Sequence, residues 1–201
     1  MRRVEIIGFK RANLGKTESK AIRLRGDVPC VLYGGDSQVH FYAPAIQFRD
    51  VLYTPEPCFV DLNIEGDLYQ AIVQDSQYHP VNEMLLHVDF LQLFTGKTIK
   101  MEIPVVMEGT SPGVKSGGAL VVKKPKLLVK ALPKNMPASI SIDISKLKLG
   151  KSTKVGALTP SDYEIMTSPL VTIASVAIPR ALRGTAAMNE EEEEETPAAA
   201  E

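Results

Sequence analysis

Eight prolines divide residues 95–183 of this chain into short segments, and they restrict its fold more than any other feature. They lie at Pro104, Pro112, Pro125, Pro133, Pro137, Pro160, Pro169 and Pro179. Because proline lacks a backbone N–H and clashes with the preceding helical turn, this spacing excludes long helices. Between the prolines the pattern is almost purely that of strands, and Ser139–Ser145 alternates cleanly as a half-buried strand does. We therefore predict strands at Ile99–Glu108, Ala119–Lys124, Leu127–Leu132, Ile140–Ile144 and Leu170–Ile178.

The first 94 residues show mixed periodicity, with short strands and two helices. A helix is expected at Thr17–Arg25, with Thr17 as N-cap and Gly26 as the residue after the C-cap. A second, short helix is expected from Ala45 to about Leu52. Strands are expected at Val4–Phe9, Val28–Tyr33, Val39–Ala43, Phe59–Ile64, Leu68–Gln77 and His87–Leu93, with a hairpin turn at Glu65-Gly66-Asp67. The fold class is thus mainly β with short helices, and a small curved antiparallel sheet or barrel fits this region.

Charge divides the chain into three parts. Residues 1–94 carry 9 basic and 12 acidic side chains, residues 95–183 carry 14 and 5, and residues 184–201 carry none and 7. We predict a first domain at 1–94, a β-rich second domain at 95–183, and an acidic tail at 184–201 that is too polar to fold. The six glutamates Glu190–Glu195 are either an acidic arm that masks a basic surface or mimics nucleic acid, or a solubilising tail.

Several classes of protein are not favoured by the sequence. No apolar run approaches the roughly 20 residues that span a bilayer, and the apolar part of the N-terminus is too short for a signal peptide, so a cytoplasmic protein without a membrane partner is expected. The two cysteines, Cys30 and Cys58, have apolar neighbours and are expected to be buried free thiols. No metal-ligand spacing, P-loop or dinucleotide motif is present, so no cofactor is predicted. The segment Ser111–Gly118 is expected to be a turn rather than a phosphate-binding loop.

A basic segment is the first candidate binding site. Eight Lys and Arg residues lie between Arg2 and Arg25, against two acids. In this segment, Lys16, Ser19, Lys20 and Arg23 follow i, i+3, i+4, i+7 spacing and therefore share one helical face. Such a face suits several phosphates at once, although a solvated charged helix gives the same pattern.

Two polar segments some fifty residues further on are the second candidate. Alternation places Asp75, Gln77 and His79 on one face if the strand extends that far, and His87 with Asp89 on one face of the next strand. Glutamine and histidine suit base edges or 2′-hydroxyls, but an edge strand with a polar outer face is an alternative. The His87–Asp89 pair also suits a general base in a hydrolase, although no nucleophile motif accompanies it.

Longer motifs carry a family resemblance. GKTESKAIRLR, PCVLYGG and QDSQYHPVNEMLLHVDFLQL in the first domain, with IPVVMEGTSPGVKSGGAL and LPKNMPASISIDISKLKLG in the second, resemble the bacterial large-subunit ribosomal protein family that binds 5S rRNA. The match is closest to its long form, which includes the general stress protein Ctc. The resemblance implies a six-stranded β-barrel-like first domain that contacts 5S rRNA. It implies RNA-facing residues at Arg11, Lys16, Ser19, Arg23, Tyr33, Gln74, Gln77, His79, His87 and Asp89, with Lys20 where many members have arginine.

The function expected from this resemblance is that of a structural constituent of the large ribosomal subunit. It would be ribosome-associated and not an enzyme, with no small-molecule substrate. Its partners would be 5S rRNA and, near the second domain, other large-subunit components. The alternative is a stress-linked, translation-associated interaction module that acts mainly through the second domain.

Overall fold

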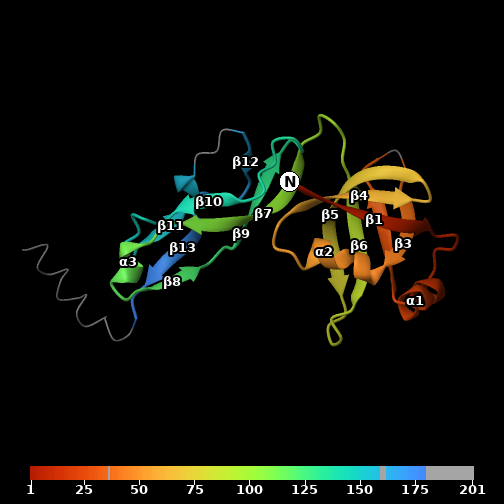
Figure 1. The fold of residues 1–201 in the computed structure, drawn as a ribbon, viewed down its shortest axis with the longest axis horizontal. Helices are drawn as coiled ribbons and strands as arrows, with labels where there is room; N and C mark the ends of the chain where they lie inside the picture. The colour runs from red at the N-terminus through yellow and green to blue at the C-terminus, as the bar shows by residue number, and fades with distance from the viewer. Residues whose placement is uncertain (36, 159–161, 180–201) are drawn as a thin grey trace, which may run out of the picture. The chain divides into compact units, whose positions relative to one another are not determined.

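The computed structural model describes residues 1–35, 37–158 and 162–179, and it divides into two compact units (Figure 1). The first unit comprises Met1–Pro104, Leu128–Ser139 and Asp162–Ile165, and the second comprises Val105–Leu127, Ile140–Ser161 and the residues from Met166 onward. The mainly β fold class is confirmed. The acidic tail predicted at 184–201 lies outside the described residues, and the domain boundary near Thr95–Lys97 remains a prediction.

Six strands of the first unit form a closed barrel, which confirms the barrel expectation. Around the barrel the strands follow the order β1 (Arg2–Lys10), β3 (Val39–Pro44), β2 (Asp27–Tyr33), β6 (Leu85–Gln92), β5 (Asp67–Tyr78) and β4 (Cys58–Ile64). Two of the barrel's strand pairs are parallel rather than antiparallel: β1 pairs with β4, and β2 pairs with β6. These two parallel pairs join segments that are distant in sequence.

The barrel interior is filled by alternate side chains of every strand. Phe41 and Phe90 lie with ring centroids 5.8 Å apart, and Phe48 lies 6.3 Å from Phe90. The predicted short helix consists of a 3-10 turn, η1 (Ala45–Phe48), and one turn of α-helix, α2 (Arg49–Leu52). Because Phe48 and Val51 belong to the same buried cluster, this helical segment contributes to the barrel core.

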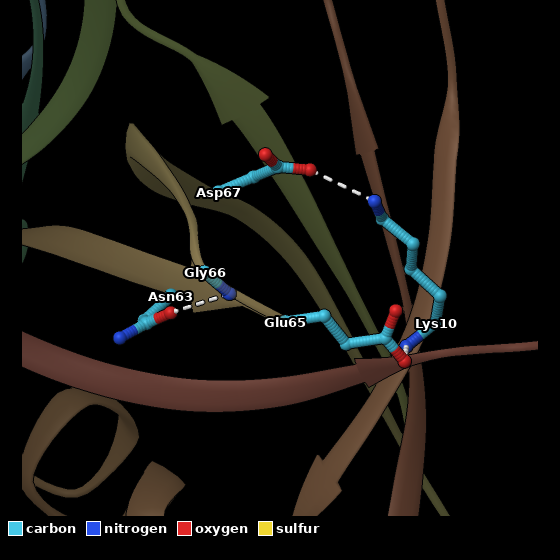
Figure 2. Close-up of polar contacts among 5 residues, drawn as sticks. All are labelled: Lys10, Asn63, Glu65, Gly66 and Asp67. Atoms are coloured by element: carbon cyan, nitrogen blue, oxygen red, sulfur yellow. Dashed lines mark hydrogen bonds and ion pairs between the residues drawn. The ribbon is translucent and has the colours of Figure 1, made fainter.

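The β4–β5 hairpin turns at Glu65 and Gly66, which both have positive φ (53° and 99°) as a type I′ turn requires. Figure 2 shows that this hairpin also receives the end of β1: the backbone N–H of Lys10 donates to Glu65 (3.1 Å), and Lys10 Nζ donates to Asp67 (2.8 Å). The hydrogen bond and charge of Asp67 raise the pKa of Lys10. Lys10, one of the cations of the basic segment, thus pairs with the hairpin.

The basic helix is α1 (Lys16–Leu24), and it begins one residue earlier than predicted. The N-cap is Gly15 rather than Thr17: the backbone N–H of Ser19 donates to the Gly15 carbonyl (3.0 Å), and no side chain caps this end. Gly26 has φ of 86° and donates to the Arg23 carbonyl, so its predicted place after the C-cap is confirmed.

The remaining strands form two small sheets. The first has the order β10 (Ile140–Asp143), β7 (Ile99–Glu108), β9 (Lys126–Ala131) and β12 (Glu164–Ile165), and the second has β11 (Ser152–Lys154), β13 (Thr172–Ala177) and β8 (Ala119–Val122). All five predicted strands are present. The two short strands β11 and β12 and a 3-10 turn, η2 (Val155–Ala157), were not predicted.

The glycine-rich loop after β7 has a structural role. It contains one helical turn, α3 (Pro112–Lys115), which the sequence did not predict, capped by the Ser111 side chain. Ser111 Oγ and the Gly113 N–H both donate to the carbonyl of Leu147. A Cβ on Gly113 would lie 2.7 Å from the backbone nitrogen of Leu149, so glycine permits this close approach. These contacts support a turn rather than a phosphate site.

The two cysteines are free and buried, with exposed fractions of 1% for Cys30 and 7% for Cys58, as expected. Burial raises the pKa of both thiols and so suppresses the reactive thiolate.

We expect iodoacetamide to leave Cys30 unmodified in the folded protein and to modify it only as fast as the barrel opens, which mass spectrometry measures. Complete labelling of Cys30 in protein that still gives the native circular dichroism spectrum would contradict this expectation.

Candidate nucleic-acid interface

The outer surface of strands β2, β6 and β5 collects polar residues from three separate segments. Gln77 lies opposite His87, and Asp89 lies opposite both Asp75 on one side and Val31 on the other. Residues directly opposite one another point to the same side of a sheet. Since Val88 and Phe90 are fully buried, their neighbours His87 and Asp89 point outward. We call this surface, with Tyr33, Asp75, Gln77, His87 and Asp89, the three-strand face.

His87 and Asp89 form the best-defined pair on the three-strand face. His87 Nδ1 and Asp89 Oδ1 are 2.7 Å apart, and both side chains are about 30% exposed or less. This contact fixes the imidazole plane and commits Nδ1 to the carboxylate. The ring therefore presents Nε2 outward as its second hydrogen-bonding atom, next to a carboxylate that accepts hydrogen bonds from hydroxyl or amino groups.

Tyr33 lies close to the two carboxylates of this face. Partial burial raises the pKa of its phenol above the ordinary value of 10.0, and the negative charges of Asp89 and Asp75 raise it further. Both effects act in the same direction because each disfavours the phenolate. Tyr33 thus remains a neutral hydroxyl, able to donate and accept, at physiological pH.

An ultraviolet absorbance titration can test this placement of Tyr33. We expect the phenolate of Tyr33, isolated as the difference between the wild type and Tyr33→Phe, to appear above pH 10. Asp89→Asn removes one of the negative charges that raise the pKa of Tyr33, so it should lower that midpoint. Glu56→Gln is the control: it removes one negative charge that is not among the causes of the shift, and it should leave the midpoint unchanged. An unchanged midpoint in Asp89→Asn would contradict the arrangement.

Gln74 and His79 lie where β5 departs from regular pairing. The register shifts between Val73 and Asp75, so Gln74 occupies a bulge and is exposed. The strand ends at Tyr78, so the condition under which alternation would place His79 on that face is not met. Instead, His79 Nδ1 accepts the backbone N–H groups of Val81 and Asn82, both at 3.2 Å. His79 organises the β5–β6 turn, and only its Nε2 remains to face a ligand.

Helix α1 adds cations beside the three-strand face. Arg23 Nε donates to the carbonyl of Leu86 (2.9 Å), the residue that immediately precedes His87. Arg11 Nη2 donates to Ser19 Oγ (3.0 Å), which in turn donates to the Gly15 carbonyl. The side chains of Lys16 and Lys20 are exposed. The structure therefore joins Arg23 to the His87 strand, joins Arg11 to Ser19, and leaves the two lysines pointing into solvent.

One residue of this surface was not selected from the sequence, and another was placed only on the face of its own strand. Asp75 lies opposite Asp89, and His40 on β3 lies opposite Val31, so both share one row across four strands. Only the cross-strand register brings them together. Asp75 was visible in the alternation of its own strand, whereas no local pattern indicates His40.

The groups on this surface are suited to recognising a ligand through hydrogen bonds, and the neighbouring cations are suited to binding phosphate. It offers carboxylates, amides, an imidazole and a phenol, which suit base edges and 2′-hydroxyls, with arginine and lysine at its border. In the ranges 1–35, 37–158 and 162–179, no group of three or more His, Cys, Asp or Glu could hold a metal ion. None of the described helices is long and apolar enough to cross a membrane.

Comparison with known proteins assigns the family. Residues 6–90 match the Ribosomal L25p family, and residues 98–180 match the C-terminal domain of ribosomal protein TL5. The chain is 55% identical to the large ribosomal subunit protein bL25 of Cytophaga hutchinsonii, covering 91% of this chain and 95% of that one. It is 52% identical to the bL25 of Amoebophilus asiaticus (93% and 95%) and 42% identical to that of Bacteroides fragilis (93% and 98%). The chain therefore belongs to the bL25 family of large-subunit ribosomal proteins, in its long form with a TL5-type C-terminal domain.

Proposed function

We propose that this protein, a structural constituent of the large ribosomal subunit, binds 5S rRNA through the three-strand face and helix α1. The observation that carries the proposal is the convergence on one outer surface of the oriented His87–Asp89 pair, Gln77 and Tyr33, with Arg23 bonded to the same strand. Membership in a ribosomal protein family supports rRNA as the partner and the bacterial cytoplasm as the location.

In this proposal the cations and the polar face have different tasks. Lys16 and Lys20 are exposed point charges, so they suit phosphates, while Arg11 and Arg23 are held near the barrel and position α1. The wide, shallow minor groove of A-form RNA admits the outer face of a barrel, where His87, Asp89 and Gln77 can meet base edges and 2′-hydroxyls. Tyr33, Gln74 and the Nε2 of His79 would extend the contact along β2 and β5.

The family also bears on the hydrolase alternative. The relatives that match nearly the whole chain are ribosomal proteins, so the prediction that this chain is not an enzyme is confirmed. The His87–Asp89 contact is thus assigned to orientation of a hydrogen-bonding group rather than to proton abstraction. Contacts of the C-terminal part with other large-subunit components remain a proposal, supported by the +9 charge of residues 95–183.

Replacing His87 with alanine tests the proposed contact most directly. We expect 5S rRNA affinity to fall by about 1–2 kcal/mol, since one oriented hydrogen bond to RNA is lost while the outward position tolerates alanine. A gel-shift titration at fixed salt measures the change, together with hydroxyl-radical footprinting of the bound RNA. Tyr53→Ala, which removes a 69% exposed ring next to α2, is the control and should bind as the wild type does. Equal affinity for His87→Ala and the wild type would refute the assignment.

A further inference from the structure

A groove lined by lysines lies in the second unit, among residues that the 5S rRNA proposal does not use. The groove has a volume of about 620 Å³ and is bordered by Lys146, Lys151 and Lys154, with Ser152, Thr153 and Asp143. All three lysine side chains are exposed. The side chains that line the groove therefore carry a net charge of +2, and Ser152 and Thr153 add two hydroxyl groups.

The backbone around the groove is well connected, so the lysines project from fixed positions. Strand β11 pairs with β13, and the Lys151 carbonyl accepts the N–H of Val176 (3.1 Å). On the opposite border, the Gly156 N–H donates to the Pro169 carbonyl (3.0 Å). Asp143 already accepts the N–H of Ser145 (2.8 Å). The hydrogen bonds from Ser145 and the nearby Lys146 ammonium lower the pKa of this carboxyl, so Asp143 offsets part of the charge of Lys146, and the lining keeps its net charge of +2.

The chain leaves the described structure beside this groove. The N–H of Gly150 donates to the Val176 carbonyl (3.0 Å), and a Cβ on Gly150 would lie 3.5 Å from Ile178 Cδ1. The end of β13 therefore lies next to Gly150, which directly precedes Lys151. The described residues end at Pro179, and the six glutamates begin eleven residues later at Glu190. Eleven residues span at most about 40 Å when extended, and about 18 Å as a flexible chain.

We propose that the Glu190–Glu195 segment binds the lysine groove of its own chain and so competes with other polyanions for it. Six carboxylates meet a groove of +2, and the only charges between Pro179 and Glu190 are Arg180 and Arg183. Tethering gives the glutamates an effective concentration of the order of millimolar. Lysines are flexible point charges, so a run of glutamates needs no fixed geometry to pair with them. This inference does not depend on the 5S rRNA contact.

A spin label at the tail locates the segment directly. Because Cys30 and Cys58 are buried, an added thiol in Asn189→Cys can be labelled selectively with a nitroxide in the full chain. In about 10 mM salt, where charges interact over roughly 30 Å, we expect the amide NMR signals of Ser152, Thr153 and Gly156 to lose at least about half their intensity. In the groove variant Lys146→Gln/Lys151→Gln/Lys154→Gln, this loss should fall to the smaller value that an unbound tail tethered at Pro179 produces.

A matched control removes the same charge elsewhere in the second unit. Lys115→Gln/Lys123→Gln/Lys124→Gln replaces three exposed lysines that do not line the groove, and it should leave the signal loss unchanged. A loss in the groove variant as large as in the wild type, or an equal reduction in both triple variants, would overturn the proposal. So would intact signals at all three groove amides in the labelled wild type.

Polyanion binding gives an independent readout. Replacing Glu190–Glu195 by glutamines should raise the affinity for poly(U) by roughly five-fold in about 10 mM salt, and by less than two-fold in about 200 mM salt, because the competing contact is screened. In the groove-variant background the same replacement should have no such effect. If the groove variant loses poly(U) affinity while the glutamine variant binds as the wild type does, the groove is a surface for RNA alone and the proposal fails.

Discussion

The variant Arg23→Ala is expected to bind 5S rRNA about 2–3 kcal/mol more weakly than the wild type, a loss of roughly 30- to 150-fold. Arg23 Nε is bonded to the Leu86 carbonyl, so the guanidinium is held at the border of the three-strand face with its two Nη groups left for phosphate. Alanine removes this cation and also the bond that joins α1 to β6. The cationic helix then loses its fixed position relative to His87 and Asp89.

The measurement is a 5S rRNA titration at one fixed salt concentration, since phosphate contacts make affinity strongly dependent on salt. Arg49→Ala is the matched control, because Arg49 is an exposed arginine on α2 of the same barrel. The affinity of Arg23→Lys for 5S rRNA should fall between those of the alanine variant and the wild type, since lysine keeps the charge but lacks the planar, bidentate guanidinium. If Arg23→Ala binds as tightly as Arg49→Ala while both melt like the wild type, the proposed role of α1 is wrong.

The strands of the barrel could be predicted because their signals are local. Alternation with a period of two residues marks each strand, and the turn at Glu65 and Gly66 follows from residues that lie next to each other in sequence. The His87–Asp89 pair is local in the same sense, because residues that are two positions apart on a strand lie on the same face of the sheet. The structure accordingly places both side chains outward, as the sequence predicted.

Features that depend on register could not be read from the sequence. The Lys10–Asp67 contact joins residues 57 positions apart, and only the closure of β1 against β4 brings them together. The bulge at Gln74 and the end of β5 before His79 likewise depend on pairing with β6, not on the residues of β5 alone. His40 escaped selection for the same reason, because it joins the outer row through β2.

The capping error at α1 has a separate physical cause. Threonine is a favoured N-cap, so Thr17 was the natural choice on residue type. The structure instead begins the helix after Gly15, whose extended backbone (φ −157°) aims its carbonyl at the Ser19 N–H, and Ser19 Oγ donates to the same carbonyl. The backbone path out of β1 thus overrides the preference of a single side chain, and it moves Lys16 into the helix.

Phe90→Ala is expected to lower the free energy of unfolding of the barrel by about 3–5 kcal/mol, the largest effect predicted for a single change in this chain. Phe90 has no exposed surface, and its ring packs against Phe41 and Phe48. Alanine leaves a cavity at the contact of three aromatic rings. Urea unfolding followed by circular dichroism measures the loss, and Phe90→Leu, which keeps most of the volume, should lose less than half as much.

Phe90 and Asp89 are neighbours on β6 that point to opposite sides of the strand. A variant in the core therefore tests the effect of stability on RNA binding, whereas a variant on the outer surface tests the RNA contact itself. Phe90→Ala should weaken 5S rRNA binding only in proportion to the fraction of molecules that are unfolded, since its side chain never reaches the surface. Adding a stabilising osmolyte should therefore restore binding to Phe90→Ala but not to Arg23→Ala. If the osmolyte restored both variants equally, Arg23 would act through stability and not through RNA; if it restored neither, the core would shape the binding surface more directly than the geometry of β6 implies.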